Sequence, residues 1–388
     1  MTSYIPSAQK INVIFVTSVF GQVHNGPGLY ANYLWHRFKN DPDINFHIVT
    51  PQSNQKHPRI HLSGFHSNSR LLYKRLQLKG VRVAQSLGPQ KVIIHCNNAH
   101  CMSLLKPEHG YLIGQINDYD AARILSEPLK ILKRSGIRRV FSLVYRHYNE
   151  AQSLKKIDLG ICNSRYVFAE GLKQYGACYK DKLIVLHKGI DFSEFASLRF
   201  KDSPDRAKED LLFVGSNWAG KGLEIAIRAV ANLPPQLNHI NLKVAGKSNS
   251  AQSYIHRLTR KLNVSDRVKF LGNVKRADLP TLMSNSSILL FPSHNEALGV
   301  TVIEAIASGL PVIASNVGGI PEVLSNMQCS RLIHNSPKHF THEIISILEN
   351  YPNHSQSESD RSKVKHVFNI EKLTTELKTI YMSAGEGS

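Results

Sequence analysis

The sequence predicts an α/β fold made of two doubly wound parallel-sheet domains. The chain has 388 residues, which is enough for two domains of ordinary size. Strand-like apolar segments alternate with helix-like segments in both halves, and a polar, charged stretch with Pro204 separates the halves at 196–209. We therefore expect a first domain over residues 1–195 and a second domain over residues 208–368.

The first half contains six strand-like segments that are separated by helical ones. A glycine-bearing loop over residues 21–28 leads into Leu29–Phe38, whose apolar residues follow helical spacing. Because helices separate successive strands, the strands should lie parallel in one sheet. The predicted strands are Ile11–Thr17, Phe46–Thr50, Lys91–His95, Gly110–Ile116, Leu159–Asn163 and Leu183–His187.

The second half begins a new sheet after the linker. A strand over Asp210–Gly215 is followed by a loop and by a helix over Leu223–Leu233. The polar segment 351–363 is expected to be a surface loop, and a last helix is expected over about Ile370–Met382. The other predicted strands are Leu242–Gly246, Val268–Gly272, Ile288–Phe291 and Pro311–Ala314.

Composition indicates a cytoplasmic protein. The sequence contains no run of eighteen apolar residues, so no transmembrane helix is predicted. The N-terminus lacks the basic start and apolar core of a signal peptide. The five cysteines show no CxxC pair and no regular spacing, which favours reduced thiols over disulfides or a metal site. They are Cys96, Cys101, Cys162, Cys178 and Cys329.

The formal charge of +19 is concentrated in the first half. Residues 1–200 hold 27 basic and 12 acidic residues, whereas the remainder holds 21 and 17. Two regions are strongly basic: Arg70–Lys79 has no acid, and 123–156 has nine Lys and Arg against Glu127 and Glu150. Amphipathic basic helices bind anionic leaflets, so we expect peripheral docking on the inner face of the cytoplasmic membrane. The alternative is a solvated helical face.

The segment from Phe291 to Ala314 carries the clearest chemistry. Glu296 and Glu304 lie eight positions apart, between two apolar runs that predict buried strands. The layout predicts a strand, a loop, a helix beginning near Gly299 and a second strand. A helix start presents free N–H groups and suits a phosphate, whereas Glu304 and Glu296 can accept hydrogen bonds from ribose and sugar hydroxyls. An ordinary solvated glutamate pair is the alternative.

This segment resembles the signature of the retaining glycosyltransferase family 4, which has the GT-B fold of two Rossmann-like domains. The following Gly309-Leu-Pro-Val and Gly318-Gly319-Ile-Pro-Glu322 also match the family's pattern. The resemblance implies that the final helix, within 369–388, completes the N-terminal acceptor-binding domain. It also implies that the second domain binds the nucleotide sugar through Glu296, Ala297, Leu298, Gly299, Val300 and Glu304.

Lys221, after the first strand of the second domain, matches the family's lysine that contacts the donor diphosphate. An ammonium at this place would stabilise the charge of the departing nucleoside diphosphate. The family's arginine after the strand's glycine is missing, because Gly215 is followed by Ser216 and Asn217. Val274 lies in the segment whose backbone meets the nucleobase in the family.

The first domain should contribute a glycine loop and polar residues at strand ends. Gly26 and Gly28 resemble the loop that approaches the donor phosphate and the acceptor, although an ordinary turn is an equal alternative. Asn117 stands where many family members have a histidine near the donor sugar. His95, at the end of a predicted strand, is a further catalytic candidate or else a structural residue.

The resemblance implies a retaining hexosyltransferase without a cofactor or metal, using a nucleoside diphosphate sugar, with UDP-sugars favoured over GDP-sugars. The acceptor would be a glycan, a glycolipid or a lipopolysaccharide-type molecule. A sugar-nucleotide epimerase or hydrolase on the same scaffold is an alternative. A nucleic-acid-binding protein is disfavoured, because the sequence has no zinc finger, basic zipper or RNA-binding signature.

Overall fold

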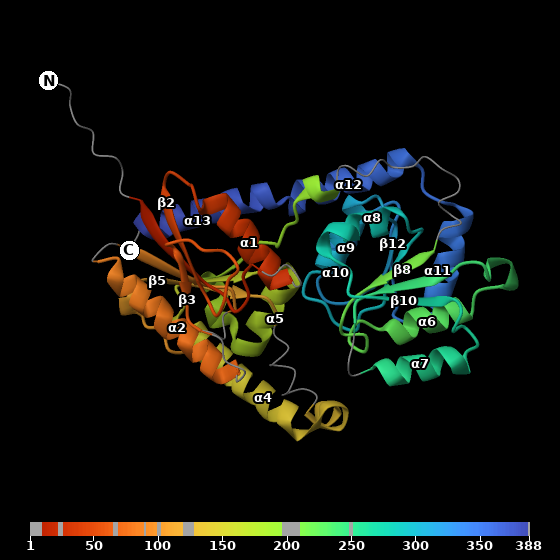
Figure 1. Cartoon of the computed structure of the whole chain (residues 1–388), viewed down its shortest axis with the longest axis horizontal. Helices are drawn as coiled ribbons and strands as arrows, with labels where there is room; N and C mark the ends of the chain where they lie inside the picture. The colour runs from red at the N-terminus through yellow and green to blue at the C-terminus, as the bar shows by residue number, and fades with distance from the viewer. Residues whose placement is uncertain are drawn as a thin grey trace. The chain divides into compact units, whose positions relative to one another are not determined.

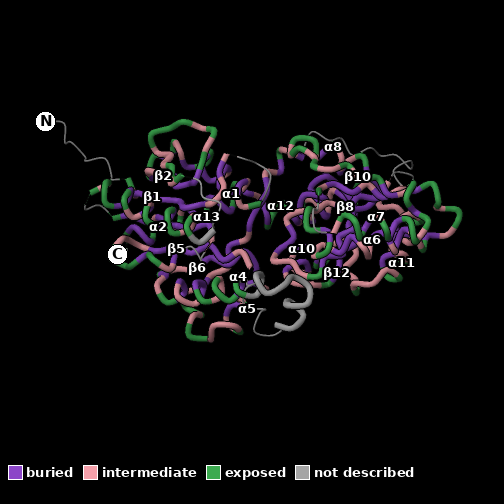
Figure 2. Tube along the Cα trace, turned by 60° about the horizontal axis from the view of Figure 1, so that its bottom comes forward, coloured by how far each residue is buried: buried purple, intermediate pink, exposed green. Residues whose placement is uncertain are grey.

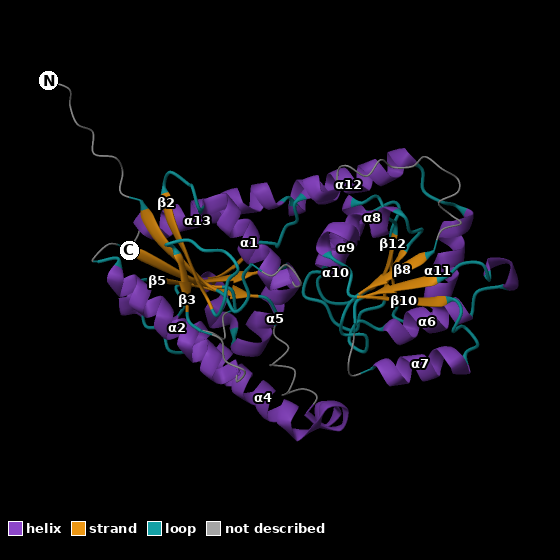
Figure 3. Cartoon of the chain, in the orientation of Figure 1, coloured by secondary structure: helices purple, strands orange, loops and turns teal. Residues whose placement is uncertain are grey.

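The chain forms two compact α/β units (Figure 1). Unit 1 comprises Met1–His187 and Lys372–Ser388, and unit 2 comprises Lys188–Glu371. Each has helices packed around a parallel sheet (Figure 3), so the expected fold class is confirmed. The units divide at His187, whereas the sequence placed the end of the first domain at residue 195. The computed structural model describes residues 10–21, 26–64, 69–88, 91–98, 102–118, 128–195, 210–247 and 251–386.

Unit 1 contains a seven-stranded sheet in the order β3-β2-β1-β4-β5-β6-β7, with every neighbouring pair parallel. The central strands are buried on both faces, which explains their continuous apolar sequences (Figure 2). The sequence did not predict β3, which has three residues and no buried face. The strands are β1 (Ile11–Val16), β2 (Ile44–Thr50), β3 (Ile60–Leu62), β4 (Val92–Cys96), β5 (Tyr111–Ile116), β6 (Leu159–Cys162) and β7 (Leu183–Val185).

The last helix of the chain, α13 (Ile370–Glu386), packs on unit 1. Its Tyr381 is fully buried, with the ring 5.8 Å from that of Phe38. Its Lys378 Nζ donates to Asp41 at 2.8 Å and to Asp43 at 2.6 Å. The C-terminal helix is therefore held in unit 1 by aromatic packing and by ion pairs. The other α-helices described in this unit are α1 (Gly26–Phe38), α2 (Ser69–Ser86), α4 (Pro128–Lys156) and α5 (Arg165–Tyr175).

Unit 2 contains a six-stranded parallel sheet in the order β10-β9-β8-β11-β12-β13. Side chains alternate between its faces, so that Leu212 and Leu289 enter one hydrophobic cluster, and Phe213 and Leu290 enter another. The short β13 was not predicted. The strands are β8 (Leu211–Val214), β9 (Leu242–Ala245), β10 (Val268–Gly272), β11 (Leu289–Phe291), β12 (Val312–Ser315) and β13 (Arg331–Ile333).

Helices and short 3-10 turns cover this second sheet. The α-helices are α6 (Leu223–Ala231), α7 (Gln252–Lys261), α8 (Leu279–Ser284), α9 (Val300–Ala307), α10 (Ile320–Leu324), α11 (Pro337–Glu349) and α12 (His354–Phe368). Within the described residues of both units, no helix is long and apolar enough to cross a membrane.

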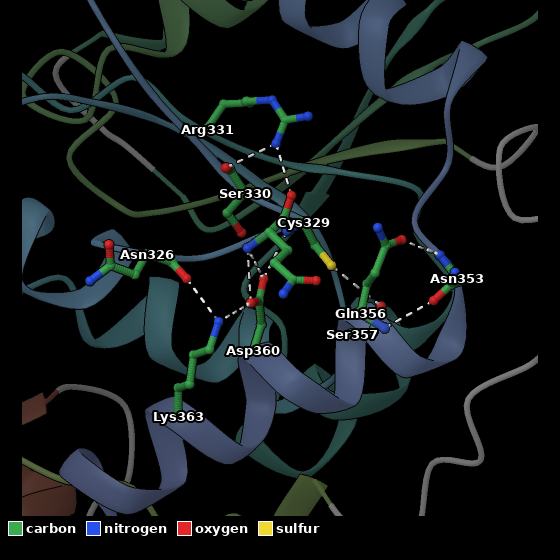
Figure 4. Close-up of polar contacts among 10 residues, drawn as sticks. Asn326, Cys329, Ser330, Arg331, Asn353, Gln356, Ser357, Asp360 and Lys363 are labelled. Atoms are coloured by element: carbon green, nitrogen blue, oxygen red, sulfur yellow. Dashed lines mark hydrogen bonds and ion pairs between the residues drawn. The ribbon is translucent and has the colours of Figure 1, made fainter.

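The expected surface loop over 351–363 is wrong, because most of it belongs to α12. The side chain of Asn353 caps the helix by accepting a hydrogen bond from the Gln356 N–H, and Asp360 is buried on the inner face of the helix (Figure 4). The Asp360 carboxylate accepts hydrogen bonds from the backbone N–H groups of Gln328 at 2.9 Å and Cys329 at 2.8 Å. A polar composition therefore hides a helix whose buried acid fastens the loop before β13.

Candidate active site

In unit 2, Lys221 and Glu296 form an ion pair at the carboxyl end of the sheet. Lys221 lies after β8 and Glu296 lies after β11, which pair as neighbouring strands. The Lys221 ammonium donates to Glu296 Oε2 and lies 5.2 Å from the ring centroid of Phe291. Both side chains are partly exposed, so a ligand can reach them. The structure thus brings together two predicted residues that are 75 positions apart.

Glycines let the loops of this site approach one another closely. Gly222 has φ +72°, and a Cβ there would lie 2.0 Å from the carbonyl oxygen of Pro292. Gly318 has φ +59°, and a Cβ there would lie 1.8 Å from the carbonyl oxygen of Glu296. These positions exclude any side chain, because both the backbone conformation and the space require glycine. The two loops are further joined by a hydrogen bond from the His294 N–H to Gly220 O at 3.0 Å.

Helix α9 begins directly after residues 292–299, which carry Glu296 and are called the glutamate loop, as predicted. Its N-cap is Gly299, in the left-handed region at φ 90°, and no side chain caps it. The first turn has no acidic residue, so the positive end of the helix is not neutralised by its own side chains. Val300 is partly buried at the first position of the helix, and Leu298 is buried beneath the loop. This helix start can accept an anion such as a phosphate.

Glu304 lies on the inner side of α9 and is only 4% exposed. Burial raises the pKa of its carboxyl, and the neighbouring guanidinium of Arg276 opposes that rise. Arg276 donates from Nη1 to Glu304 Oε1, and from Nη2 to Glu194 Oε2 at 2.9 Å. Sequence reasoning missed Arg276, because its partners lie 28 and 82 residues away along the chain.

The remaining predicted donor residues lie around the Lys221 loop or follow β10. Ser216 and Asn217 are exposed, and Asn217 Oδ1 accepts the Gly220 N–H at 3.2 Å. Asn217 therefore shapes the turn that carries Lys221. A Cβ on Gly215 would lie 3.1 Å from Lys221 Cγ, so this glycine makes room for the lysine stem. Val274 follows β10 and packs against the core cluster around α9, and Ala297 is partly buried in the glutamate loop.

In unit 1, side-chain amides line the carboxyl ends of three neighbouring strands. Asn117, after β5, donates from Nδ2 to Asn97 O at 2.6 Å and to Asn98 Oδ1 at 2.8 Å. Asn163, after β6, donates from Nδ2 to Asn117 O at 3.0 Å. These acceptors fix which way each amide points, and the Oδ1 atoms of Asn117 and Asn163 have no hydrogen-bond partner among the described residues. Both oxygens are buried, so the network serves to join the ends of the three strands.

The predicted glycine loop of unit 1 is tied to this network. Asn97 Nδ2 donates to the carbonyl oxygen of Pro27 at 3.1 Å. Pro27 lies between Gly26, which is exposed, and Gly28, which is buried at the start of α1. Residues 22–25 of the expected loop lie outside the described residues. The start of α1 is thus positioned beside the ends of β4 and β5.

His95 lies near the carboxyl end of β4, but its side chain is on the face of the sheet that α13 covers. His95 is fully buried within β4, where its Nδ1 lies 2.7 Å from Tyr381 Oη and its ring packs edge-on against Phe15 at 5.0 Å. A residue enclosed between the sheet and α13 cannot reach a ligand, so His95 belongs to the packing of unit 1. The predicted strand Lys91–His95 differs from β4 by one residue at each end, and the sequence did not reveal which face His95 occupies.

Unit 1 also holds an acid cluster that the sequence did not single out. Arg146 of α4 pairs with Asp118, which directly follows Asn117, and donates from Nε to Glu150 Oε1 at 3.1 Å. Tyr175 Oη of α5 donates to Glu150 Oε2 at 2.9 Å. Burial raises the pKa of Glu150 to about 7, against the lowering influence of Arg146. Across the described residues of the chain, no group of three or more His, Cys, Asp or Glu side chains could hold a metal ion.

The two parallel-sheet units match the GT-B fold of solved glycosyltransferase structures. Among solved structures, Anabaena Alr3699/HepE in complex with UDP matches with a TM-score of 0.69 and 18% identity, over 97% of this chain and 100% of that one. The crystal structure of WaaG, a glycosyltransferase involved in lipopolysaccharide biosynthesis, matches with a TM-score of 0.70 and 18% identity, over 93% and 98%. At these identities the matches establish the fold.

Sequence comparison relates part of the chain, mainly unit 2, to known glycosyltransferases. Residues 194–363 match the family described as glycosyl transferases group 1. The lipopolysaccharide glucosyltransferase WaaG of Escherichia coli strain K12 is 34% identical over 123 residues, 32% of each chain. A D-inositol 3-phosphate glycosyltransferase of Corynebacterium aurimucosum is 26% identical over 256 residues, 62% of this chain and 60% of that one. The resemblance predicted from the motif is confirmed, although these matches span a third to three fifths of the relatives' lengths.

Proposed function

We propose that the protein is a retaining glycosyltransferase that moves a hexose from a nucleoside diphosphate sugar to a glycan, glycolipid or lipopolysaccharide-type acceptor. The observation that carries the proposal is the Lys221–Glu296 ion pair beside the uncapped start of α9. One small surface then offers a cation, a positive helix end and a carboxylate. These are the groups needed to bind a diphosphate and the hydroxyls of an attached sugar.

Each residue has a distinct role in this scheme. The Lys221 ammonium and the first N–H groups of α9 stabilise negative charge on the departing diphosphate. Glu296 accepts hydrogen bonds from hydroxyls of the transferred sugar, and Glu304 accepts them from the ribose. The leaving diphosphate helps to deprotonate the acceptor on the face it departs from, which retains the anomeric configuration.

We favour UDP-sugars as donors, with no metal or other cofactor. The structures of Alr3699/HepE include complexes with UDP and with UDP-glucose, which supports testing uridine nucleotides first. Thermal-shift measurements with UDP-, GDP- and ADP-sugars should show stabilisation by one series. If none of the three series of nucleotide sugars stabilised the protein, this result would contradict the proposed donor site.

A transfer assay tests the reaction itself. With the donor found above, Glu296→Ala should reduce transfer by at least about a hundredfold, because it removes the carboxylate that orients the sugar. Lys221→Ala should slow the chemical step more than it weakens donor binding. Glu224→Ala is the matched control, since Glu224 makes an exposed ion pair with Arg228 on α6. Full activity of Glu296→Ala would contradict the site.

Product analysis separates the transferase from its nearest rival. Incubation of the donor with and without candidate glycan and lipid acceptors should give a new glycoside only when the acceptor is present. An epimerised or hydrolysed sugar that forms equally without acceptor would instead support the epimerase or hydrolase. Analysis of the anomeric configuration of the product would decide between retention and inversion.

We further propose that unit 1 docks peripherally on an anionic membrane surface. On α4, Phe141, Val144, Tyr145 and Tyr148 follow helical spacing and are 63%, 49%, 39% and 60% exposed. On α2, exposed Leu71 and Leu78 alternate with exposed Lys74 and Arg75. Apolar and aromatic side chains among basic ones suit the interface of an anionic bilayer, and the charge of this half matches it.

Vesicle sedimentation tests this docking. The protein should bind phosphatidylglycerol-containing vesicles at low salt and bind phosphatidylcholine vesicles weakly. The double variant Phe141→Ser/Tyr148→Ser should reduce binding, whereas Leu271→Ser, which removes a 42% exposed leucine from unit 2, should not. Equal sedimentation with and without anionic vesicles at low salt would refute the proposal.

A further inference from the structure

Arg276 lies between two carboxylates of unit 2. It follows β10, and its guanidinium reaches Glu304 on α9 and Glu194 on the short 3-10 helix Phe192–Phe195. Two of its nitrogens, Nε at 3.2 Å and Nη2 at 2.9 Å, donate to the same oxygen of Glu194. The ring of Phe195 lies 5.4 Å from the guanidinium carbon. Glu194 and Phe195 therefore hold the guanidinium so that Nη1 points at Glu304.

The carboxylate of Glu304 depends on this contact. A buried carboxyl without a cation takes up a proton, because the charged form loses its hydration. Arg276 supplies the opposing charge and occupies Glu304 Oε1. Among the described residues, no donor bonds to Glu304 Oε2, although the side chain is almost fully buried. Glu304 therefore retains an acceptor for a hydroxyl group of a ligand.

We propose that Arg276 is the positioning residue of the nucleoside subsite: it keeps Glu304 aimed and ionised to accept hydrogen bonds from the ribose hydroxyls of a nucleoside diphosphate. This role rests on the proposed donor site and goes beyond it, since it makes recognition of ribose depend on a residue outside the glutamate motif. Glu194 assists by holding the guanidinium in one orientation.

Three features of nucleotide binding should change together if Arg276 has this role. Arg276→Met should weaken UDP binding by about tenfold to a hundredfold, because hydrogen bonds to a charged acceptor are lost. The same variant should lose the preference for UDP over 2′-deoxy-UDP. Its affinity for UDP should rise from pH 7 to pH 9, as Glu304 becomes ionised, whereas the unmodified protein should change little over this range.

Calorimetric titration of UDP and 2′-deoxy-UDP into the full chain measures all three features. Arg276→Lys should restore the flat pH profile, because it keeps a cation beside Glu304, and should recover part of the affinity. Arg228→Met, which breaks the exposed Arg228–Glu224 pair, is the matched control and should bind as the unmodified protein does. Circular dichroism shows which variants are folded, and the pH profile of Arg276→Lys decides the test if Arg276→Met does not fold.

The outcomes distinguish this role from the proposed function. An Arg276→Met variant that binds UDP with unchanged affinity, or that loses UDP and 2′-deoxy-UDP equally with a flat pH profile, would overturn the positioning role alone. A pH-dependent UDP affinity in Arg276→Lys would overturn it as well. Failure of the unmodified protein to bind UDP, with GDP and ADP tried in parallel, would instead overturn the donor site and this role with it.

Discussion

Each unit of the molecule places one arginine between two acids near the carboxyl ends of its strands. In unit 1, Arg146 pairs with Asp118 and Glu150. In unit 2, Arg276 pairs with Glu194 and Glu304. The inner glutamates are similar, since the side chains of Glu150 and Glu304 are 5% and 6% exposed and burial raises the pKa of both carboxyls. The electrostatic arrangement is thus the same in two unrelated sequence contexts.

The two clusters differ in how the inner carboxylate is satisfied. Glu150 Oε1 accepts a hydrogen bond from Arg146, and Glu150 Oε2 accepts one from the Tyr175 hydroxyl, so protein groups use both oxygens. Glu304 receives Arg276 on Oε1, and no described residue donates to Oε2. The difference indicates that the Glu150 cluster fastens α4 to α5 and to the end of β5, whereas the Glu304 cluster is built to receive a ligand.

The largest expected effect comes from removing Arg146 from the Glu150 cluster, which we call the closed cluster because protein groups use both carboxylate oxygens. Arg146→Met leaves Asp118 and Glu150 without their shared cation, and breaking a buried pair in this way costs about 3–5 kcal/mol. The loss should be smaller at pH 5 than at pH 8, because Glu150 can then be protonated. Urea unfolding monitored at both pH values measures it. If the loss of stability at pH 8 were equal to or smaller than the loss at pH 5, Glu150 would not be the group that is left without a cation.

The second effect isolates the ionisation of Glu150. Its pKa is about 7 in the folded protein, which is above the ordinary value of 4.5, so the folded state holds the proton more tightly. Unfolding free energy should therefore fall as pH rises from about 4.5 to about 7, by on the order of 3 kcal/mol from this group. Glu150→Gln cannot titrate, so its stability relative to the unmodified protein should rise over that interval. Parallel pH profiles for the two proteins would contradict the raised pKa.

The third effect tests whether Glu304 serves a ligand. Glu304→Gln should weaken UDP binding by about 1.5–3 kcal/mol, since a charged hydrogen-bond acceptor is replaced by a neutral one. Glu150→Gln is the matched change in the closed cluster and should leave UDP affinity unchanged. Calorimetric titration at pH 8 compares them. If both variants lost affinity equally, the distinction between an open and a closed cluster would be lost.

The sequence predicted the sheets better than it predicted these clusters. Long apolar strands such as Ile11–Val16 are visible because burial on both faces requires continuous hydrophobicity. The three-residue strands Ile60–Leu62 and Arg331–Ile333 carry no such pattern. Helix α12 was missed because its inner face uses buried Ser357 and Asp360 alongside apolar residues. The spacing of Asn353 and Gln356, which form a capping box, was the available signal.

Within the candidate site, residues in local motifs were predictable and their partners were not. Glu296 and Glu304 were found because their spacing around a glycine turn predicts a loop and a helix start, and Lys221 was found because it matches a lysine of the family that the motif resembles. Arg276 acts through contacts that depend on how distant segments pack, which no local spacing encodes. The four-residue spacing of Arg146 and Glu150 is visible in the sequence, but the contact of Arg146 with Asp118 is not. His95 illustrates the converse, since a polar residue near a strand end proved to be enclosed by α13.

The smallest expected effect concerns the hydroxyl that closes the unit 1 cluster. Tyr175→Phe removes the donor to Glu150 Oε2 and the contact of the same hydroxyl with His147 Nδ1 at 3.0 Å, while it keeps the ring that stacks on His147 at 5.3 Å. The cost should be about 1 kcal/mol at pH 8, where Glu150 is ionised. It should decline as the carboxyl protonates, because a neutral carboxyl is a weaker acceptor. Thermal unfolding of the single variant and of Tyr175→Phe/Glu150→Gln at pH 8 measures the coupling. If the two changes were additive, the hydroxyl would not act through Glu150, and that oxygen would be as open as Oε2 of Glu304.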